Sequence, residues 1–560
     1  MPPLARPSGN TSSPFAPHKS LEFMMATATV SLTLPGRGGA CRCRLFTLLL
    51  AALTLGMAGC ASLPAGVQGS PSQALAPAES SPLVALARRA SPGYALTGVR
   101  LLPLGTHSLD ARLQLIARAT QSLDLQYYVL DNDNSGRLLL GRLADAAARG
   151  VRVRLLVDDL YSTHTDPLLR AMAALPRVEV RLFNPFAAAR DSGLAGRFAA
   201  SLFDIRRLNH RMHNKLMLAD GAWAIAGGRN IADDYFQRGT QHNFIDLDAL
   251  LTGAVVADLA ASFDRYWNSP VVVPIEALSA HADSAQQLRT RFAALTADAR
   301  SAPLPDLPET DALGHGPIGA EFDSGRPQLI WGPALMLADP PDKLDRDADT
   351  AWADSQAFQA LMKIWTAREE VVITSPYLIP GPLGISAFEA LGQRRVKVTV
   401  LTNSLAATDE PLVHTGYARY RPQLLAAGVE LYELSPSLSQ RHTRLGLFGS
   451  STGRLHAKTA VVDGDKTFIG SMNLDPRSRT QNTELGIFIE SRELAAEMQR
   501  VIRISRVQNA YRVRLGADGQ LQWVAVDDDK EVVHHSEPES SLWQRLQNNL
   551  LSGFVPEQLL

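Results

Sequence analysis

The chain has 560 residues, of which 46% are hydrophobic, with 55 basic and 56 acidic side chains and a formal net charge of −1. This length and apolar content suffice for two domains of ordinary size. Residues 1–59 hold five basic residues and one acidic residue, so the remainder carries 50 basic and 55 acidic side chains. A nuclease usually presents a basic face to phosphates, and the bulk charge therefore argues against a nucleic-acid partner.

The first segment, residues 1–59, has the features of a secretion signal. Arg42 and Arg44 precede an apolar run from Leu45 to Leu55, which is too short to cross a bilayer. The Pro- and Ser-rich start does not look like the beginning of a signal. We therefore expect translation to begin at one of two later methionines, Met24 or Met25.

A possible lipid-attachment site follows directly. The stretch Met57-Ala58-Gly59-Cys60-Ala61 is similar to a bacterial lipoprotein box, so Cys60 is expected to carry the lipid and anchor the chain to a membrane. The other cysteines, Cys41 and Cys43, lie in the signal, so disulfides contribute nothing to the body. Ala61 indicates a lipoprotein of the cell envelope that faces the periplasm from the outer membrane. A plain signal peptide with an incidental Cys is the alternative.

Two similar halves are expected after a Pro- and Ala-rich tether at residues 60–84. In the first half, at residues 85–270, Leu123–Val129 is predicted to be a buried strand. Ser135–Gly150 is predicted to be a helix and Val151–Asp158 a second strand.

Residues 271–330 lack clear periodicity and are expected to form an interdomain excursion. The second half, at residues 331–560, repeats the earlier pattern with a strand at Val371–Ser375, a helix near Ile385–Leu391 and a strand at Val396–Thr402. This alternation of strands and helices predicts mixed α/β layers in each half.

A motif of fixed spacing occurs once in each half. In both copies Lys lies two residues after a His, Asp seven, Gly fourteen and Asn seventeen. The chain has 8 Lys against 47 Arg, so finding two of its lysines in this setting is informative. The copies are His213-Asn214-Lys215 with Asp220 and Gly227-Gly228-Arg229-Asn230, and His456-Ala457-Lys458 with Asp463 and Gly470-Ser471-Met472-Asn473.

These residue types suit a phosphodiester without a metal ion or cofactor. On a strand, His and Lys two residues apart point to one face, and two such strands bring two imidazoles and two ammonium groups around one pocket. One imidazole can attack phosphorus, and the other can protonate the leaving alkoxide. The lysines can stabilise the negative charge on the non-bridging phosphate oxygens. For either copy alone, a structural His is the alternative. Asp220 and Asp463 each precede Gly, as hairpin residues do.

The two motifs resemble the H-x-K-x4-D-x6-G-(S/G)-x-N signature of the phospholipase D superfamily. From about residue 105 onward, further segments are similar to the C type of bacterial cardiolipin synthase: Arg181–Phe186, Arg207–Lys215, Leu401–Ala407, His414–Arg419 and Asp475–Ser478. This resemblance implies an α/β fold with two similar phospholipase D-like α-β-α sandwich domains and an active site at their interface.

The resemblance also implies roles for individual residues. The catalytic set is His213, Lys215, Asp220, His456, Lys458 and Asp463, and the supporting set is Asn230, Ser471, Asn473, Asp246 and Glu484. Asp246 and Glu484 match acidic residues that orient the histidines and fix their tautomer. By the same resemblance His213 becomes the phosphohistidine and His456 the acid. The first motif has Gly228 where the second has Ser471, which removes one hydroxyl donor.

The implied function is a phosphatidyltransferase that makes cardiolipin from phosphatidylglycerol and a second phospholipid, such as phosphatidylethanolamine. Hydrolysis to phosphatidic acid is the alternative, and a periplasmic nuclease is a weaker one. A non-catalytic scaffold would be expected to lack a motif His, Lys or Asn, and none is missing. The resemblance is compatible with an accessory protein, which nothing in the sequence identifies.

Two aromatic segments allow both a lipid-binding and a packing interpretation. One helical face near the C-terminus carries Trp543, Leu546, Leu550 and Phe554, which would lie on a membrane interface or pack on the chain's own domain. The second group would line an acyl or headgroup channel: Tyr127, Tyr128, His414, Tyr417, Arg419 and Tyr420. The alternative is ordinary packing for the tyrosines and a solvated face for Arg419.

Overall fold

The structure is a computed structural model that describes residues 68–551, apart from gaps at 94, 187–189, 191, 202–203, 279–282, 305, 344–354, 442–450 and 528–529. The expected secretion signal, the lipid site Cys60 and Phe554 lie outside the described residues. In the described part of the chain, no helix has both the length and the apolar character needed to span a membrane.

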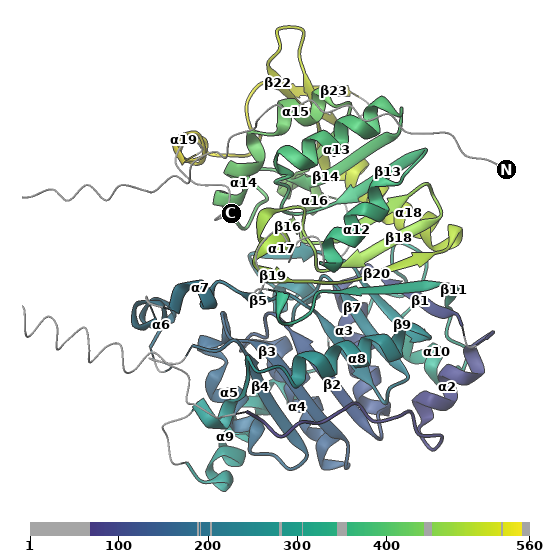
Figure 1. Cartoon of the computed structure of the whole chain (residues 1–560), viewed down its shortest axis with the longest axis vertical. Helices are drawn as coiled ribbons and strands as arrows, with labels where there is room; N and C mark the ends of the chain where they lie inside the picture. Colours follow the sequence, from purple (N-terminus) through teal and green to yellow (C-terminus); the bar gives the residue numbers. More distant parts are fainter. Residues whose placement is uncertain are drawn as a thin grey trace, which may run out of the picture. The chain divides into compact units, whose positions relative to one another are not determined.

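A nine-stranded sheet forms the centre of the first half (Figure 1). Its central strands are rich in apolar residues and are buried, so each is covered on both faces. The strand order is β10 (Val272–Pro274), β4 (Val178–Phe183), β3 (Arg152–Asp158), β2 (Ser122–Tyr127), β6 (Leu216–Ala219), β7 (Trp223–Gly227), β9 (Asp248–Gly253), β1 (Thr97–Leu102) and β11 (Ile330–Gly332).

A ten-stranded sheet forms the second half and repeats this topology. Each sheet contains three neighbouring parallel strands. The first of the three also pairs with an antiparallel strand, which begins at the motif lysine or at the residue after it. The order is β12 (Ala334–Ala338), β20 (Leu485–Glu490), β18 (Lys466–Gly470), β17 (Lys458–Val462), β13 (Glu370–Thr374), β14 (Lys397–Asn403), β15 (Glu430–Leu434), β21 (Ala510–Leu515), β22 (Leu521–Asp527) and β23 (Lys530–His534).

Helices cover the sheets in both halves. Those of the first half are α2 (Pro82–Ala90), α3 (Gly105–Arg118), α4 (Asn134–Ala148), α5 (Asp166–Ala173), α6 (Leu194–Ala200), α7 (Ile205–Leu208), α8 (Val255–Trp267), α9 (Ala285–Ser301) and α10 (Ile318–Ser324). Those of the second half are α12 (Gln356–Trp365), α13 (Gly381–Gln393), α14 (Pro411–Ala418), α15 (Arg421–Ala426), α16 (Pro436–Arg441), α17 (Pro476–Thr480), α18 (Arg492–Gln508) and α19 (Leu542–Leu551).

The predicted strand–helix–strand units are confirmed in both halves. They correspond to β2, α4 and β3 in the first half and to β13, α13 and β14 in the second. Helix α4 begins where Asp133 accepts a hydrogen bond from the Gly136 N–H and ends just before Gly150, whose φ of 105° stops the helix. The fold is therefore the expected α/β fold with two similar domains.

One hydrophobic core joins the two halves. Leu218 on β6 and Val461 on β17 belong to the same buried cluster, together with residues of α8 and α18. A separate cluster lies between the first sheet and helices α3, α4 and α5. Because the motif strands β6 and β17 both contribute to the shared core, the ends of these strands are held in a fixed relation to each other.

The segment predicted to be a flexible tether is bound to the body where the structure describes it. Its extended backbone is held by side chains of the first half: Arg181 donates to the Ser70 carbonyl at 2.6 Å, and the Ala74 N–H donates to Asp264 at 2.7 Å. A Pro-rich stretch cannot pair regularly with itself, so side chains satisfy its backbone groups here. Residues 70–84 are consequently part of the first half.

Residues 271–330 also belong structurally to the first half. Strand β10 pairs with β4, and β11 pairs with β1, so this segment completes both edges of the first sheet. Helix α9 begins with a capping box at Ser284 and packs on α4 and α5 through Phe292. The predicted excursion therefore differs from the structure, because short edge strands and a helix with few buried positions give weak periodicity.

Candidate active site

Two small sheets bring the motif histidines to the boundary between the halves. Strand β5 (Arg211–Met212) runs parallel to β19 (Asn482–Thr483), and β8 (His242–Ile245) runs parallel to β16 (Thr452–Leu455). Each sheet thus joins the strand before one motif to the strand before an acidic residue of the other half. The His213 N–H donates to the Thr483 carbonyl at 2.9 Å, and the His456 N–H donates to the Ile245 carbonyl at 2.8 Å.

This pairing crosses the histidines and carboxylates between the halves. Continuing the register by one residue places His213 beside Glu484 and His456 beside Asp246. Nδ1 of His213 lies 3.0 Å from the Glu484 carboxylate, and Nδ1 of His456 lies 2.6 Å from the Asp246 carboxylate. A carboxylate at Nδ1 favours the tautomer with the proton on Nδ1, which leaves the Nε2 lone pair available. Each half therefore orients the histidine of the other.

The two motif lysines are buried beside the histidines. Both are 1% exposed, and each donates to the carbonyl of its own motif histidine, Lys215 at 2.6 Å and Lys458 at 2.5 Å. The first motif's His and Lys lie between β5 and β6, and in the second motif the His follows β16 and the Lys begins β17. The expected single strand is therefore interrupted at the histidine. The interruption lets the imidazole join the small sheet while the lysine begins the large one.

A cavity of about 990 Å³ contains both histidines. Tyr128 meets the His213 ring edge-on with centroids 4.9 Å apart, and Tyr235 meets the His456 ring edge-on at 5.1 Å. Asn230 donates to the Tyr235 hydroxyl at 2.9 Å and accepts from the Val129 N–H, so its amide supports this wall. The wall residues that sequence analysis did not assign to the site include Tyr161, Tyr235, Tyr377, Asp409, Glu410 and Arg477.

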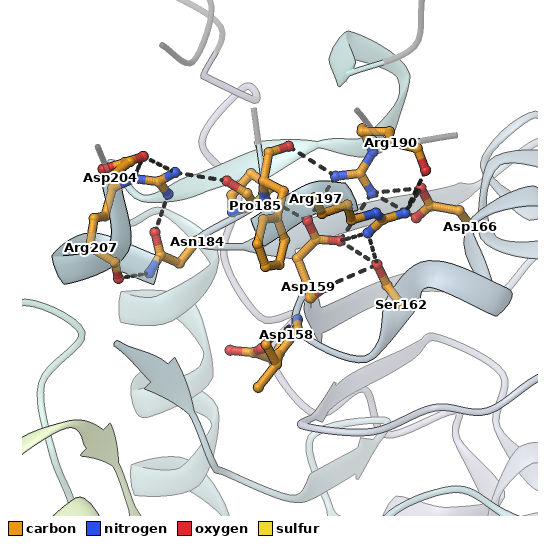
Figure 2. A network of polar contacts seen from close by, with 12 residues as sticks. Asp158, Asp159, Ser162, Asp166, Asn184, Pro185, Arg190, Arg197, Asp204 and Arg207 are labelled. Atoms are coloured by element: carbon orange, nitrogen blue, oxygen red, sulfur yellow. Dashed lines mark hydrogen bonds and ion pairs between the residues drawn. The ribbon is translucent and has the colours of Figure 1, made fainter. Parts of the chain in front are cut away.

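Buried ion pairs anchor the chain that leads to His213. Asp158, at the end of β3, accepts from the Met212 N–H at 2.8 Å and from the Arg211 guanidinium at 3.1 Å. Figure 2 shows the neighbouring network, in which Arg190 binds both Asp159 and Asp166. These charge-assisted bonds hold the irregular segment between β4 and β5 against β3. The position of His213 is thereby fixed on both sides.

The carboxylate Glu484 has more partners than Asp246, and this difference accounts for Gly228. Glu484 accepts hydrogen bonds from the hydroxyls of Ser471 and Ser478. A side chain at Gly228 would instead collide with the carboxylate of Asp246. The shorter approach of Asp246 occupies the space that the Ser471 side chain fills in the second half. The first motif thus has no hydroxyl equivalent to that of Ser471, and its carboxylate Asp246 lies closer to the histidine it contacts than Glu484 does.

The two motif aspartates do not lie in the cavity. Asp220 and Asp463 sit at the far ends of β6 and β17, separated from the motif lysines by roughly 16 Å of extended chain. Both adopt positive φ, near 50°, immediately before a glycine. The structure places these two residues in hairpin turns, away from the imidazoles.

Each motif aspartate binds the backbone that leads into a parallel strand. Asp220 accepts from the Thr120, Gln121 and Ser122 N–H groups and from the Ser81 hydroxyl. Asp463 accepts from the Arg368, Glu369 and Glu370 N–H groups, and these bonds lower its pKa although burial raises it. The conserved spacing within the duplicated motif thus has a structural cause at this position.

Replacing Asp220 with alanine should lower stability and spare catalysis. The substitution leaves one buried and two partly buried N–H groups without this acceptor, which should cost about 3 kcal/mol of unfolding free energy. Urea denaturation measures this loss, with the exposed Asp258→Ala as the control. Turnover of the folded variant should stay within about twofold of wild type. A hundredfold loss in folded protein would return Asp220 to the catalytic set.

Electrostatics in the cavity favour neutral imidazoles. Burial lowers the pKa of His213 to about 4, although Glu484 raises it, and burial also lowers the pKa of His456. Burial and the neighbouring Lys458 hold the pKa of Lys215 well below its usual range, and burial lowers the pKa of Lys458 to about 8. An anion in the cavity would offset these shifts, because it favours every protonated form.

The second aromatic group divides between the cavity and buried positions. Tyr128 lines the cavity, whereas Tyr127 is fully buried and accepts from Arg112 at 3.1 Å. His414 and Tyr417 join a buried network in which Arg421 and Tyr417 both bind Glu433. The packing interpretation therefore holds for Tyr127 and Tyr417.

A duplicated α/β domain whose halves meet around two histidines and two lysines is the arrangement of the phospholipase D superfamily. The family model described as "Cardiolipin synthase, PLD-like domain" matches residues 113–267 and 361–504, once in each half. The chain belongs to this phospholipase D-like family.

Individual proteins similar to this chain include cardiolipin synthases. The chain is 39% identical over 473 residues to Cardiolipin synthase C of Escherichia coli, which covers 82% of this chain and 96% of the relative. It is 25% identical over 398 residues to a Cardiolipin synthase of Staphylococcus aureus, covering 70% of this chain and 64% of the relative. The crystal structure of phosphatidylserine synthase from Haemophilus influenzae covers 85% of this chain and all of its own, with a TM-score of 0.53 and 14% identity. That likeness concerns the fold.

Proposed function

We propose that the protein is a phosphatidyltransferase that makes cardiolipin from phosphatidylglycerol and a second phospholipid. The observation that carries this proposal is the crossed pair of histidine–carboxylate contacts in one cavity. The identity to Cardiolipin synthase C over most of the chain supports the choice of phospholipid substrates.

The proposed first step is attack by Nε2 of His213 on the phosphorus of the donor lipid. A P–N bond forms, the P–O bond to the leaving alcohol breaks, and His456 gives its Nε2 proton to the alkoxide. Glu484 stabilises the imidazolium that forms on His213. Burial lowers the pKa of His456, and a bound phosphate opposes this shift because it favours the protonated imidazole, which is the proposed acid.

The second step reverses these roles at His456. The imidazole, now neutral, takes the proton of an acceptor hydroxyl, whose oxygen attacks phosphorus and breaks the P–N bond. Lys215 and Lys458 stabilise the charge on the non-bridging oxygens in both steps. Among the described residues, the buried side-chain oxygen of Asn473 has no hydrogen-bond partner, and Asn473 lines the same cavity. Asn473 and Asn230 are the proposed supporting amides.

The rate should fall at alkaline pH because Lys458 must be protonated to stabilise phosphate. Its pKa of about 8 predicts that kcat/KM declines as pH rises through this value. Unfolding would not explain the decline. The native pKa lies below the ordinary 10.5, so this group's contribution to stability increases between about pH 8 and 10.5. A pH–rate profile tests the prediction, and Lys466→Ala, a change of a half-buried lysine that does not line the cavity, should leave that profile unchanged.

Two features support action at a membrane surface. The first is Cys60, the proposed lipid attachment site directly after the signal region, with the mature protein facing the periplasm. The second is α19, which contacts α14 through a polar bond from Thr415 to Asn548 and exposes an apolar side. The exposed side chains are Leu542, Trp543, Leu546 and Leu550, between 56% and 79% accessible. An apolar side turned outward suits the bilayer interface.

Serine at both Trp543 and Leu546 should weaken membrane binding. In full-length protein carrying Cys60→Ala, which removes the proposed lipid, co-sedimentation with phosphatidylglycerol vesicles should fall about tenfold or more. The double variant Gln544→Ser and Gln547→Ser on the same helix is the matched control. Equal binding by both variants would mean that α19 does not contact lipid.

Product analysis tests the proposed reaction. Membranes carrying the full-length protein are given labelled phosphatidylglycerol with and without phosphatidylethanolamine, beside the His213→Ala variant. Cardiolipin that depends on the wild-type protein supports the synthase, and dependence on the second lipid identifies the donor pair. Phosphatidic acid in place of cardiolipin would mean that water is the acceptor and that the protein is a phospholipase.

A further inference from the structure

A second hollow, an apolar groove of about 500 Å³, adjoins the cavity that contains the histidines. It lies between α12 and α13 of the second half, with Leu361 and Trp365 on one side and Ala387 and Phe388 on the other. Trp365 and Phe388 meet edge-on with ring centroids 5.1 Å apart. Phe388 is completely buried, so this ring pair forms a rigid apolar floor.

One wall separates the groove from the cavity, and it belongs to the second motif. Asn473 and Asp475 line both hollows, and Met472 contributes its side chain to the groove. The wall is fixed to the loop before α13 because the Ile379 N–H donates to the Leu474 carbonyl at 2.7 Å. A ligand whose phosphate lies near the histidines can therefore reach the groove across Asn473.

The groove has polar residues on the wall that it shares with the cavity and mostly apolar residues on its other sides. Its polar lining lies along the motif wall and comprises Asn473, Asp475, Ser478 and Arg479. Its apolar rim includes Met362 and Leu383, which are 47% and 70% exposed. This gradient fits a molecule with a charged head and a hydrocarbon tail, with the head toward the cavity.

The first half closes the corresponding space. There α3 packs directly against α4, and the motif residue equivalent to Met472 is Arg229. The Arg229 guanidinium is buried and donates to the carbonyls of Leu102, Pro103 and Asp246. A charge satisfied by backbone carbonyls leaves no apolar path, so the two otherwise similar halves differ in this respect.

We propose that the groove between α12 and α13 binds one acyl chain of a phospholipid whose phosphodiester lies between His213 and His456. The inference rests on the proposed function and adds a subsite for the chain. Contact of hydrocarbon with Leu361, Trp365 and Ala387 contributes binding energy in proportion to the number of buried methylenes. The subsite consequently discriminates lipids by acyl-chain length.

Filling the groove tests this subsite. Ala387→Trp places an indole between α12 and α13, and the matched control Ala390→Trp adds the same side chain to an exposed position on α13 outside the groove. Phosphatidyl transfer is measured with dioleoyl and dioctanoyl phosphatidylglycerol in detergent micelles. Ala387→Trp should lower kcat/KM about tenfold for the dioleoyl lipid and about twofold or less for the dioctanoyl lipid. Ala390→Trp should change neither.

A second variant avoids any folding defect from the bulky indole. Leu383→Gln changes an exposed rim residue and should reduce the preference for the longer chains in the same direction. An equal loss on both lipids, or no loss for Ala387→Trp, would overturn the acyl subsite. An apolar partner protein in the groove would give no dependence on chain length, and this result too would overturn the proposal.

Crosslinking separates the subsite from the reaction. Phosphatidylglycerol with a photoreactive diazirine at the acyl terminus is irradiated with the full-length protein, and labelled peptides are mapped. Labelling of α12 or α13 that is abolished by Ala387→Trp supports the subsite. If this labelling occurs but no cardiolipin forms, the subsite is supported and only the proposed transferase activity is wrong. Labelling confined to α19 would overturn the subsite and leave the transferase standing.

Discussion

Alanine at either His213 or His456 should lower cardiolipin formation by about a thousandfold or more. Both imidazoles face one cavity, and each supplies a different element of the proposed phosphoryl transfer. Loss of either group therefore removes a whole step, and the remaining histidine cannot replace it. Product formation from labelled phosphatidylglycerol measures the effect.

His315→Ala provides the matched control for these two variants. Its imidazole pairs with Glu497 at 3.2 Å and does not line the cavity, so the control should retain nearly normal turnover. Circular dichroism and thermal unfolding confirm that each variant is folded. Near-normal turnover in either His213→Ala or His456→Ala would disprove a site shared by the two histidines.

The sequence was sufficient to predict the repeated strand–helix–strand units and the convergence of the two motifs. The buried parallel strand β13 carries an apolar run at Val371–Ile373, β2 alternates apolar and polar residues, and α4 has a clear cap and a terminal glycine. The matching distances from His to Lys and Asn in both copies made a shared site the natural expectation. Local patterns and duplication were enough for these features.

The crossing of His213 with Glu484 could not be read from local patterns. It depends on β5 pairing with β19 and on β8 pairing with β16, strands of two to four residues that are far apart in the chain. Such short strands have almost no periodicity, and their register comes from the packing of the two large sheets. The same reason explains why Tyr235 and Tyr377 were missed: tertiary contacts alone bring them to the histidines.

The motif aspartates lie in hairpin turns, although their spacing from the histidines is the same in both copies. Asp220 and Asp463 keep the same distance from their histidines in both copies, as a catalytic residue would. The spacing reflects the length of β6 and β17, because each aspartate follows the end of its strand that lies away from the histidine. The Asp-Gly turns at these positions were the local signal that pointed to the structural role.

The crossed contacts predict that Glu484 acts with His213, although they belong to different halves. Glu484→Gln removes the negative charge that stabilises imidazolium on His213, and it should lower turnover about a hundredfold or more. Asp246→Asn should produce a similar loss through His456. Natural lipids cannot distinguish the two variants, because attack and proton donation are both required.

A phosphatidyl ester of p-nitrophenol separates them, because this leaving group departs without a proton. If His213 is the nucleophile, the first release of nitrophenolate should persist in His456→Ala and Asp246→Asn, while Glu484→Gln slows it and His213→Ala abolishes it. The opposite grouping would make His456 the nucleophile. A third outcome is that Asp246→Asn abolishes the first release of nitrophenolate, as His213→Ala does, while His456→Ala retains it. The carboxylates would then not act on the histidines of the opposite half, and the proposed link between strand pairing and chemistry would be wrong.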